Sequence, residues 1–300
     1  MDQRGVGGHL RTYKVKHSTL YEYESPVLHA HHLAHLRPRS HTNQEVHLSE
    51  LEIRPTARSQ SRHKDYFGNE CDMIEVLASH DCLEIVAQTM VTVRTSPALQ
   101  LDPASSAPFE EVVALVRAKP ELLAEYEYCF DSPLVRVHSV LQDYAATVFT
   151  KKRPIVEALL DLNRRIFTDF KYDASATDVS TPLGQVMRER RGVCQDFAHV
   201  AIGVLRCVGL PARYVSGYLE TSPPPGQTRL VGADASHAWA ASFVPGFGWF
   251  DFDPTNNVVP SERHITVAWG RDFSDVSPLK GVVLGGGRHT LSVGVDVEPR

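Results

Sequence analysis

The chain has 300 residues, 42% of them hydrophobic, and a formal net charge of −5 at pH 7. This length and composition are sufficient for a well-buried core, in one large domain or two smaller ones. A slightly acidic chain without a strongly basic block argues against a nucleic-acid partner, and no stretch is apolar for long enough to span a membrane.

The cysteines fit neither a disulfide framework nor a zinc knuckle, because there are five of them and no pair has CxxC spacing. Cys194 and Cys207 lie about 20 Å apart along one predicted helix, which excludes a disulfide between them. The first ten residues lack the apolar segment of a secretory signal. We therefore expect a cytoplasmic protein with no membrane association.

The N-terminal third alternates in the manner of β-strands. Apolar and aromatic side chains share one parity from Tyr13 to Tyr23, which predicts a half-buried antiparallel strand. Further strands are predicted over 28–36, 46–53, 72–77 and 83–93. Residues 1–95 are therefore predicted to form a small all-β domain.

A segment rich in proline, serine and alanine, 96–107, reads as a linker, after which the spacing becomes helical. Residues 96–153 are therefore predicted to form a linker and a helical segment. Pro154 can open a helix whose apolar residues recur every three to four positions up to Phe170. Thr181-Pro182 opens a shorter helix that ends near Arg191.

A third helix is predicted to begin near Cys194, directly after Gly192-Val193, and to stop at Gly209-Leu210-Pro211. Strand-like runs follow it, over 212–219, 235–244, 249–252, 264–268 and 290–297. Helices followed by strands, without strict alternation, indicate the α+β class. We therefore predict a second folded unit over 154–300, consisting of a core and C-terminal strands.

Cys194 is the first candidate for chemistry, because the positive end of a helix stabilises a thiolate, and the thiolate is the nucleophile. A histidine and an acidic residue complete such a site, and His237 and Asp253 follow in a plausible order. The backbone N–H of Cys194 can donate to a developing oxyanion, with Gln195 and Trp239 as candidates for a second donor.

A hairpin is predicted to bring His237 and Asp253 together, since Pro245-Gly246 lies between two aromatic-rich strands. Side chains that face each other across an antiparallel pair share a face of the sheet. Both positions are odd-numbered, so the connection must have an odd length, such as three residues, or contain a bulge. Asp251 competes with Asp253 for the acidic role because it lies on the same strand face.

Several of these segments closely resemble the transglutaminase-like superfamily, in its bacterial branch. They are Gly192 to His199, Gly209 to Tyr218, Asp234 to Trp239 and Gly248 to Asn256. Tyr13 to Arg39 and Asp65 to Asn69 resemble the β-rich N-terminal region of that branch. The resemblance implies a papain-like transglutaminase core, in which a central helix carrying the cysteine packs on an antiparallel sheet, preceded by the small all-β domain.

The family's nucleophile falls on Cys194, its histidine on His237 and its acid on Asp253, the aspartate directly before Pro254. The resemblance implies thioester chemistry without a metal or organic cofactor, as in acyltransferases and cysteine peptidases or amidases. It also implies ATP-grasp and helical α-E proteins as partners, because bacterial relatives of this architecture are associated with them.

Substrate contacts are predicted in the polar loop 270–278, at Arg271, Asp272 and Asp275, because enzymes often place binding residues in such loops. Tyr214 and Asp234 are weaker candidates.

The histidines at 29, 31, 32, 35 and 41 are the feature that could suggest a metal site. His29 and His31 would share one strand face. No cysteine or carboxylate lies within the run to complete a set of ligands, so a structural role is favoured and no metal is predicted.

The sequence therefore predicts a cysteine-dependent hydrolase of amide, peptide or isopeptide bonds that acts on a peptide or protein. Three alternatives stay open. The same thioester could be resolved by an amine, as in a protein-glutamine acyltransferase. The chain could instead be a catalytically silent interaction module, or a metal-dependent hydrolase that uses the histidine cluster. The natural substrate and the oligomeric state do not follow from the sequence.

Overall fold

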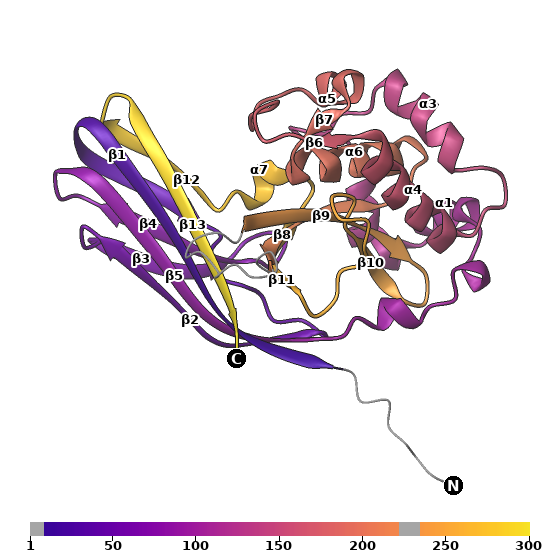
Figure 1. Ribbon diagram of the computed structural model, residues 1–300, viewed down its shortest axis with the longest axis horizontal. Coiled ribbons are helices and arrows are strands. Elements are labelled where there is room, and N and C mark those ends of the chain that lie inside the picture. Colours follow the sequence, from indigo (N-terminus) through magenta and orange to yellow (C-terminus); the bar gives the residue numbers. More distant parts are fainter. Residues whose placement is uncertain (1–8, 222–234) are drawn as a thin grey trace, which may run out of the picture.

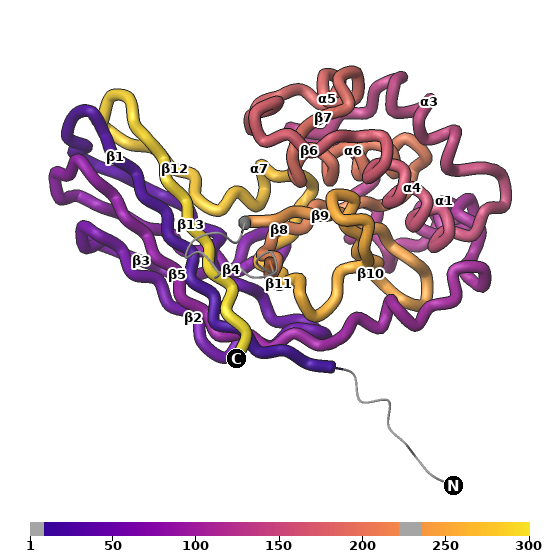
Figure 2. The backbone as a smooth tube through the Cα atoms, in the orientation of Figure 1, coloured from indigo at the N-terminus to yellow at the C-terminus, as the bar shows by residue number. Residues whose placement is uncertain are grey.

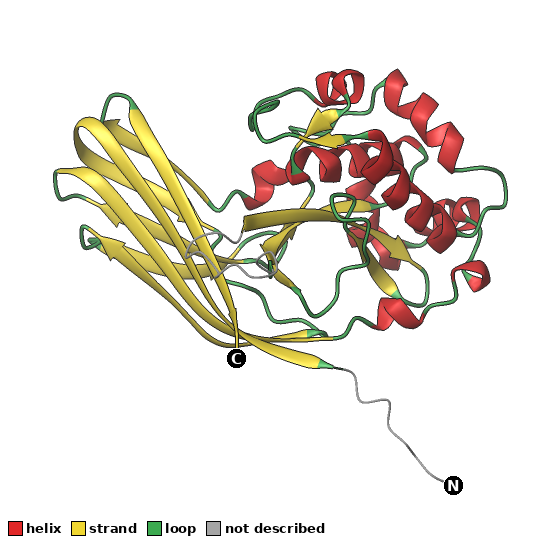
Figure 3. Cartoon of the chain, in the orientation of Figure 1, coloured by secondary structure: helices red, strands yellow, loops and turns green. Residues whose placement is uncertain are grey.

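The computed structural model describes residues 9–221 and 235–300, and it is an α+β structure in two parts. A large β-sheet lies beside a region in which helices cover a smaller sheet (Figures 1 and 3). Among the described residues, no helix is long and apolar enough to cross a membrane.

The strands of the large sheet continue one another end to end, so the described residues form four long antiparallel rows. In order across the sheet the rows are β2 (Gln44–Arg54) with β3 (Ser59–Lys64), β5 (His80–Arg94) with β4 (Glu70–Val76), β1 (Leu10–Ala34), and β13 (His289–Pro299) with β12 (Leu279–Gly285). β1 is therefore an inner row with neighbours along both sides.

The C-terminal strands belong to this sheet, which corrects their assignment to the 154–300 core. The register runs from Tyr13 opposite Pro299 to Ala34 opposite Leu279, so the end of the chain follows the whole of β1 (Figure 2). Alternation predicts that a segment is a strand but does not specify its partner. One edge of the 25-residue strand β1 pairs with β5 and β4. The backbone N–H and C=O groups on its other edge also need partners, and the last two strands of the chain supply them.

The smaller sheet has the order β10-β9-β8-β11 and is antiparallel. Its strands are β8 (Ala212–Leu219), β9 (Ala235–Val244), β10 (Gly248–Phe252) and β11 (His264–Gly270). A short parallel pair, β6 (Lys171–Tyr172) and β7 (Arg191–Gly192), lies next to the start of the central helix.

The helices pack around one central member, which is buried from Asp196 to Arg206. They are α1 (Phe109–Ala118), α2 (Leu123–Tyr126), α3 (Ser139–Val148), α4 (Ile155–Asp169), α5 (Leu183–Glu189), α6 (Cys194–Cys207) and α7 (Phe273–Val276). Four single 3-10 turns lie between β5 and α3, at Pro97–Gln100, Pro103–Ser105, Pro120–Leu122 and Glu127–Cys129. α6 packs on β9 and β8 and also contacts α3, α4 and α5. The predicted helices after Pro154, after Pro182 and at Cys194 are all present.

Two buried amide side chains join the two parts along the free edge of β11. Gln44 Nε2 donates to the Thr266 carbonyl at 2.7 Å, and Thr266 N–H donates to Gln44 Oε1 at 2.8 Å. Asn69 makes the equivalent pair with the backbone of Trp269, at 2.8 and 2.9 Å. Each side-chain amide pairs with the β11 backbone as one residue of a neighbouring strand would. The N–H and C=O groups of Thr266 and Trp269 at this edge therefore have partners without another full strand.

We predict that Gln44→Met destabilises the fold. Methionine fills a similar volume but leaves the N–H and C=O of Thr266 without their partner, at a cost of about 1–3 kcal/mol. Urea unfolding of this variant should show a lower midpoint than the wild-type protein. Gln100→Met, at an exposed position, is the matched control and should unfold like the wild type. Equal midpoints for Gln44→Met and the control would contradict this role of Gln44.

Candidate active site

Cys194 is the first residue of α6, and the local sequence fixes that start. Asp196 Oδ2 accepts from the Val193 N–H at 2.8 Å and from Thr177 Oγ1 at 2.7 Å. A Cβ at Gly192 would lie 2.9 Å from Asp196 Cβ, so only glycine leaves room for this cap. The half-buried Cys194 side chain therefore lies at the positive end of the most buried helix.

His237 is presented by β9, next to the hairpin that the sequence predicts. Val244 pairs with Gly248, so residues 245–247 form the connection, and the expected three-residue length is confirmed. Gly246 and Gly248 have φ values of +79° and +101°, which glycine adopts without strain. This register places His237 and Asp253 on the same face of the sheet.

The carboxylate of Asp253 is completely buried and accepts from five N–H groups of the described residues. Oδ2 accepts from His237 Nε2 at 2.8 Å, Asn256 Nδ2 at 2.7 Å and His264 Nε2 at 3.1 Å. Oδ1 accepts from the backbone N–H groups of Thr255 at 2.9 Å and Asn256 at 3.3 Å. Burial opposes the charge, but these donors outweigh it and hold the pKa of Asp253 well below its usual range.

The imidazole of His237 connects the carboxylate to the thiol. Burial lowers its pKa, but hydrogen bonds to Asp253 and Cys194 and their negative charges outweigh burial and raise the pKa of His237 to about 10. Because Nε2 bonds to Asp253, Nδ1 is the nitrogen left for the sulfur. The structure thus brings Cys194, His237 and Asp253 together in an arrangement suited to an imidazolium–thiolate pair.

Asp251, the alternative acid, is directed to other partners. Its Oδ2 accepts from Trp239 Nε1 at 3.3 Å, and its Oδ1 lies 3.7 Å from Arg213 Nη2. Trp239 is fully buried, so its indole N–H is committed to Asp251. This corrects the expectation that Trp239 could donate to an oxyanion or contact substrate.

Asp272 and Tyr214 are buried and contact other parts of the protein, although the sequence predicts that they contact substrate. Asp272 is fully buried and caps α7: Oδ1 accepts from Ser274 N–H at 2.8 Å, and Oδ2 from Leu134 N–H at 2.8 Å. Tyr214 is 2% exposed and packs against His199, with ring centroids 5.2 Å apart. Both expectations are corrected, because a side chain without exposed surface cannot touch a substrate.

The other predicted contacts lie in three different places, and the Arg271 carbonyl accepts from Arg206 Nη2 at 2.7 Å near the C-terminal end of α6, opposite the end that carries Cys194. Arg271 forms a two-pronged ion pair with Asp275, with Nε and Nη2 each 2.9 Å from a carboxylate oxygen. Gln195 is half-buried beside Cys194 in the first turn of α6. Asp234 lies outside the described residues.

Sequence reasoning missed Asn256 and His264, which complete the set of donors around Asp253. Asn256 lies in the segment 248–256 that carries the resemblance, so an Asp-Pro-Thr-Asn turn was an available signal. His264 had no such signal, because it reaches Asp253 only through the pairing of β11 with β8.

His237, Asp253 and His264 are close enough to hold a metal ion. Nε2 of both histidines, however, bonds to Asp253 Oδ2, and a metal would need the lone pair of each nitrogen. The arrangement is that of a hydrogen-bonded acid–base site. All five cysteines of the chain lie in the described residues and are free thiols.

Two family models match the chain. Residues 13–92 match the bacterial transglutaminase-like N-terminal region, and residues 142–254 match the transglutaminase-like superfamily. The second match contains Cys194 and His237 and ends at Pro254, directly after Asp253.

Individual relatives agree with these matches. An uncharacterized protein of Mycobacterium tuberculosis is 39% identical over 293 residues, which are 96% of this chain and 92% of that protein. A segment of 72 residues, 24% of this chain, is 40% identical to 11% of a protein-glutamine gamma-glutamyltransferase from Pseudomonas aeruginosa. The crystal structure of a candidate cysteine protease from Cytophaga hutchinsonii has the same fold, with a TM-score of 0.74 and 20% identity over 97% of this chain and 91% of that one.

Proposed function

This chain belongs to the transglutaminase-like superfamily, and from that premise we propose that it hydrolyses an amide bond of a peptide or protein through a thioester on Cys194. The observation that carries the proposal is the position of His237, which donates to Asp253 at 2.8 Å and lies close enough to Cys194 for the thiol to raise its pKa. A histidine in this position can keep the sulfur as a thiolate and supply a proton to a leaving group.

The reaction proceeds in two steps. The thiolate of Cys194 attacks the carbonyl carbon of the amide, and the tetrahedral intermediate expels the amine, which takes its proton from His237. Neutral His237 then accepts a proton from water as the water attacks the thioester. The acid is released as the intermediate expels the sulfur, and the thiolate–imidazolium pair is restored. The Cys194 N–H, and Gln195 as second candidate, donate to the oxygen that carries charge in each intermediate.

Asp253 is a positioning residue in this scheme. Five donors fix its carboxylate, and it in turn fixes the orientation of the His237 ring. The negative charge stabilises the imidazolium that each step requires without accepting the proton itself.

Hydrolysis is favoured over transfer to an amine because the described residues cover the thiol of Cys194 only in part. Cys194 is half-buried, and Tyr172, whose pKa is raised by burial and by the nearby Cys194, is 56% exposed. A transferase has to exclude water from its thioester, and a partly exposed thiol does not do so.

We predict that Cys194 reacts with iodoacetamide faster than an ordinary cysteine at pH 6. A free cysteine is only about 0.3% ionised there and gains reactivity about 100-fold by pH 8. Because the pKa of His237 is raised to about 10, its ring should stay protonated beside the sulfur from pH 6 to 8, so Cys194 should react faster than the reference peptide at pH 6. Peptide mapping after timed alkylation, with a cysteine-containing peptide as reference, measures both rates.

Cys207→Ser is the matched control and should leave this profile unchanged, whereas His237→Ala should give Cys194 the profile of the reference peptide. A wild-type Cys194 that follows the reference peptide over the whole pH range would contradict the proposed ion pair.

We also predict that water, and not an amine, resolves the thioester. A p-nitrophenyl ester of an N-acylated amino acid loads the sulfur without requiring the natural recognition. With a primary amine present, mass spectrometry should find the free acid as the main product. Cys194→Ala should lower the rate of its formation to the rate measured without protein, and Asp253→Asn should lower kcat by about 100-fold or more. After subtraction of the rates without protein, a dominant amide product would identify an acyltransferase, and product formation independent of Cys194 would refute the mechanism.

A further inference from the structure

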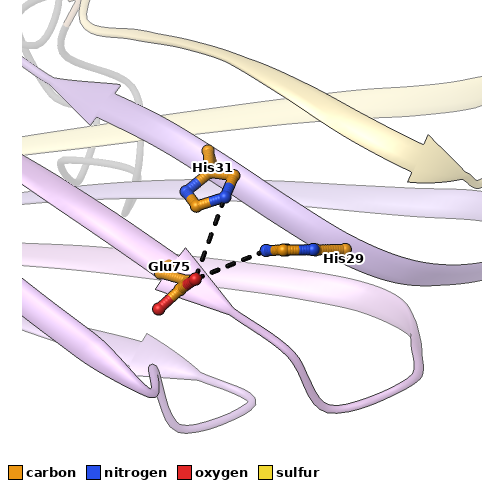
Figure 4. A group of neighbouring side chains, drawn as sticks. All are labelled: His29, His31 and Glu75. Atoms are coloured by element: carbon orange, nitrogen blue, oxygen red, sulfur yellow. Dashed lines mark ion pairs between the residues drawn. The ribbon is translucent and has the colours of Figure 1, made fainter.

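Two histidines and a glutamate meet on the outer face of the large sheet, away from the site described above. His29 and His31 alternate on β1 and so share a face, and β4 places Glu75 directly opposite His31 (Figure 4). The sequence analysis found no carboxylate within the histidine run. The strand pairing supplies one from 44 positions further along the chain.

The distances match the edges of a small coordination polyhedron. Glu75 Oε1 lies 3.4 Å from His29 Nε2 and 3.8 Å from His31 Nε2, and the three ligand atoms lie within 4.8 Å of one another. Two ligands bound at about 2.0–2.1 Å with tetrahedral angles are separated by about 3.4 Å. The His29–Glu75 pair already has this separation, and the His31–Glu75 pair exceeds it by about 0.4 Å.

The carboxylate is held in the orientation that a ligand requires. Ser59, opposite Glu75 on β3, donates through Oγ to Glu75 Oε2 at 3.2 Å, which leaves Oε1 directed at the histidines. A hydrogen bond of this kind to the second oxygen is typical of carboxylates around metal ions.

His29 Nε2 is shielded from solvent, yet it has no hydrogen-bond partner among the described residues. It lies close to Glu75 Oε1 without the geometry of a hydrogen bond. A buried polar atom of this kind is costly, and an ion between the two atoms would satisfy both.

The neighbouring side chains of β12 leave the space beside the three ligands free of a competing cation, and the ligand set itself favours a metal that binds nitrogen. Val282 and Leu284 lie opposite His31 and His29 on β12 and are 76% and 64% exposed, so they border the histidines with apolar surface. Lys280, the nearest cation on this strand, is turned to the Ser274 carbonyl at 3.1 Å. Two imidazoles and one carboxylate are a ligand set for Zn²⁺, whereas Mg²⁺ and Ca²⁺ prefer oxygen alone.

The buried group His35, Asp65 and Cys71 is a weaker candidate. His35 bonds to the Ser277 carbonyl and to Asp65, and the thiol of Cys71 donates to the Asn69 carbonyl. Its donors and acceptors are already used within the protein.

We propose that His29, His31 and Glu75 form a Zn²⁺ site with a fourth position open to water. The ion would join β1 to β4 and stabilise the folded sheet, since a ligand that binds only the folded state raises its stability. The proposal does not depend on the activity of Cys194.

Isothermal titration with ZnCl₂ on the full chain, without an affinity tag and in the Cys194→Ala background, tests the site. We expect the titration to show one Zn²⁺ per chain. Thermal unfolding of the same protein should show a rise in Tm with Zn²⁺ that excess Mg²⁺ or Ca²⁺ does not reproduce. Loss of one of three ligands in His31→Ala or Glu75→Gln should weaken binding at least about tenfold. His63→Ala, which removes an exposed histidine of β3 in the same sheet, is the matched control and should bind Zn²⁺ like its parent.

Co²⁺ provides a second readout, which reports the coordination of the ion instead of the stability of the protein. Its visible absorption should indicate a four-coordinate site in the parent protein and should be lost in His29→Asn. Absence of Zn²⁺ binding by the parent, or unchanged affinity in both His31→Ala and Glu75→Gln, would overturn the proposal.

Discussion

The hydrogen bonds to the Asp253 carboxylate are the interactions on which the site depends. A fully buried carboxylate is tolerated only when its lone pairs are satisfied. Here the donors come from β9, from the turn after β10 and from β11, so one charge joins three segments of the small sheet. The same bonds orient His237 towards Cys194. The arrangement of the site therefore follows from the need to satisfy one buried charge.

This constraint connects the site to the large sheet. His264, one of the donors, lies on β11, and the outer edge of β11 is held by the amides of Gln44 and Asn69. Tyr13 and His17 of β1 add hydrogen bonds to Glu220 and Tyr218 at the end of β8, both at 3.0 Å. The N-terminal region thus serves as part of the support for a strand that reaches the carboxylate. That role explains why a β-rich region and a core with a reactive thiol form one body (Figure 1).

The sequence predicted the features that depend on neighbouring residues, but not the contacts that depend on pairing between distant strands. Glycine at 192 and the helical period predicted the position of Cys194, and residue parity predicted the three-residue turn that brings His237 near Asp253. The partners of His264 and Glu75 depend on strand registers set by the whole sheet, which no local pattern encodes. The loop at 270–278 was misread because capping aspartates and ligand-binding aspartates have the same sequence signature. Only the burial of Asp272 separates the two roles.

The central claim is that Asp253 keeps His237 as an imidazolium beside the thiol. NMR of the ¹⁵N-histidine-labelled protein measures this directly, with the His237 signals assigned by comparison with His237→Gln. The account predicts imidazolium shifts for His237 at pH 8, where an ordinary histidine is neutral. In Asp253→Asn, burial should dominate and the ring should be neutral at that pH. A His237 that titrates near pH 6.5 in both proteins would contradict the account.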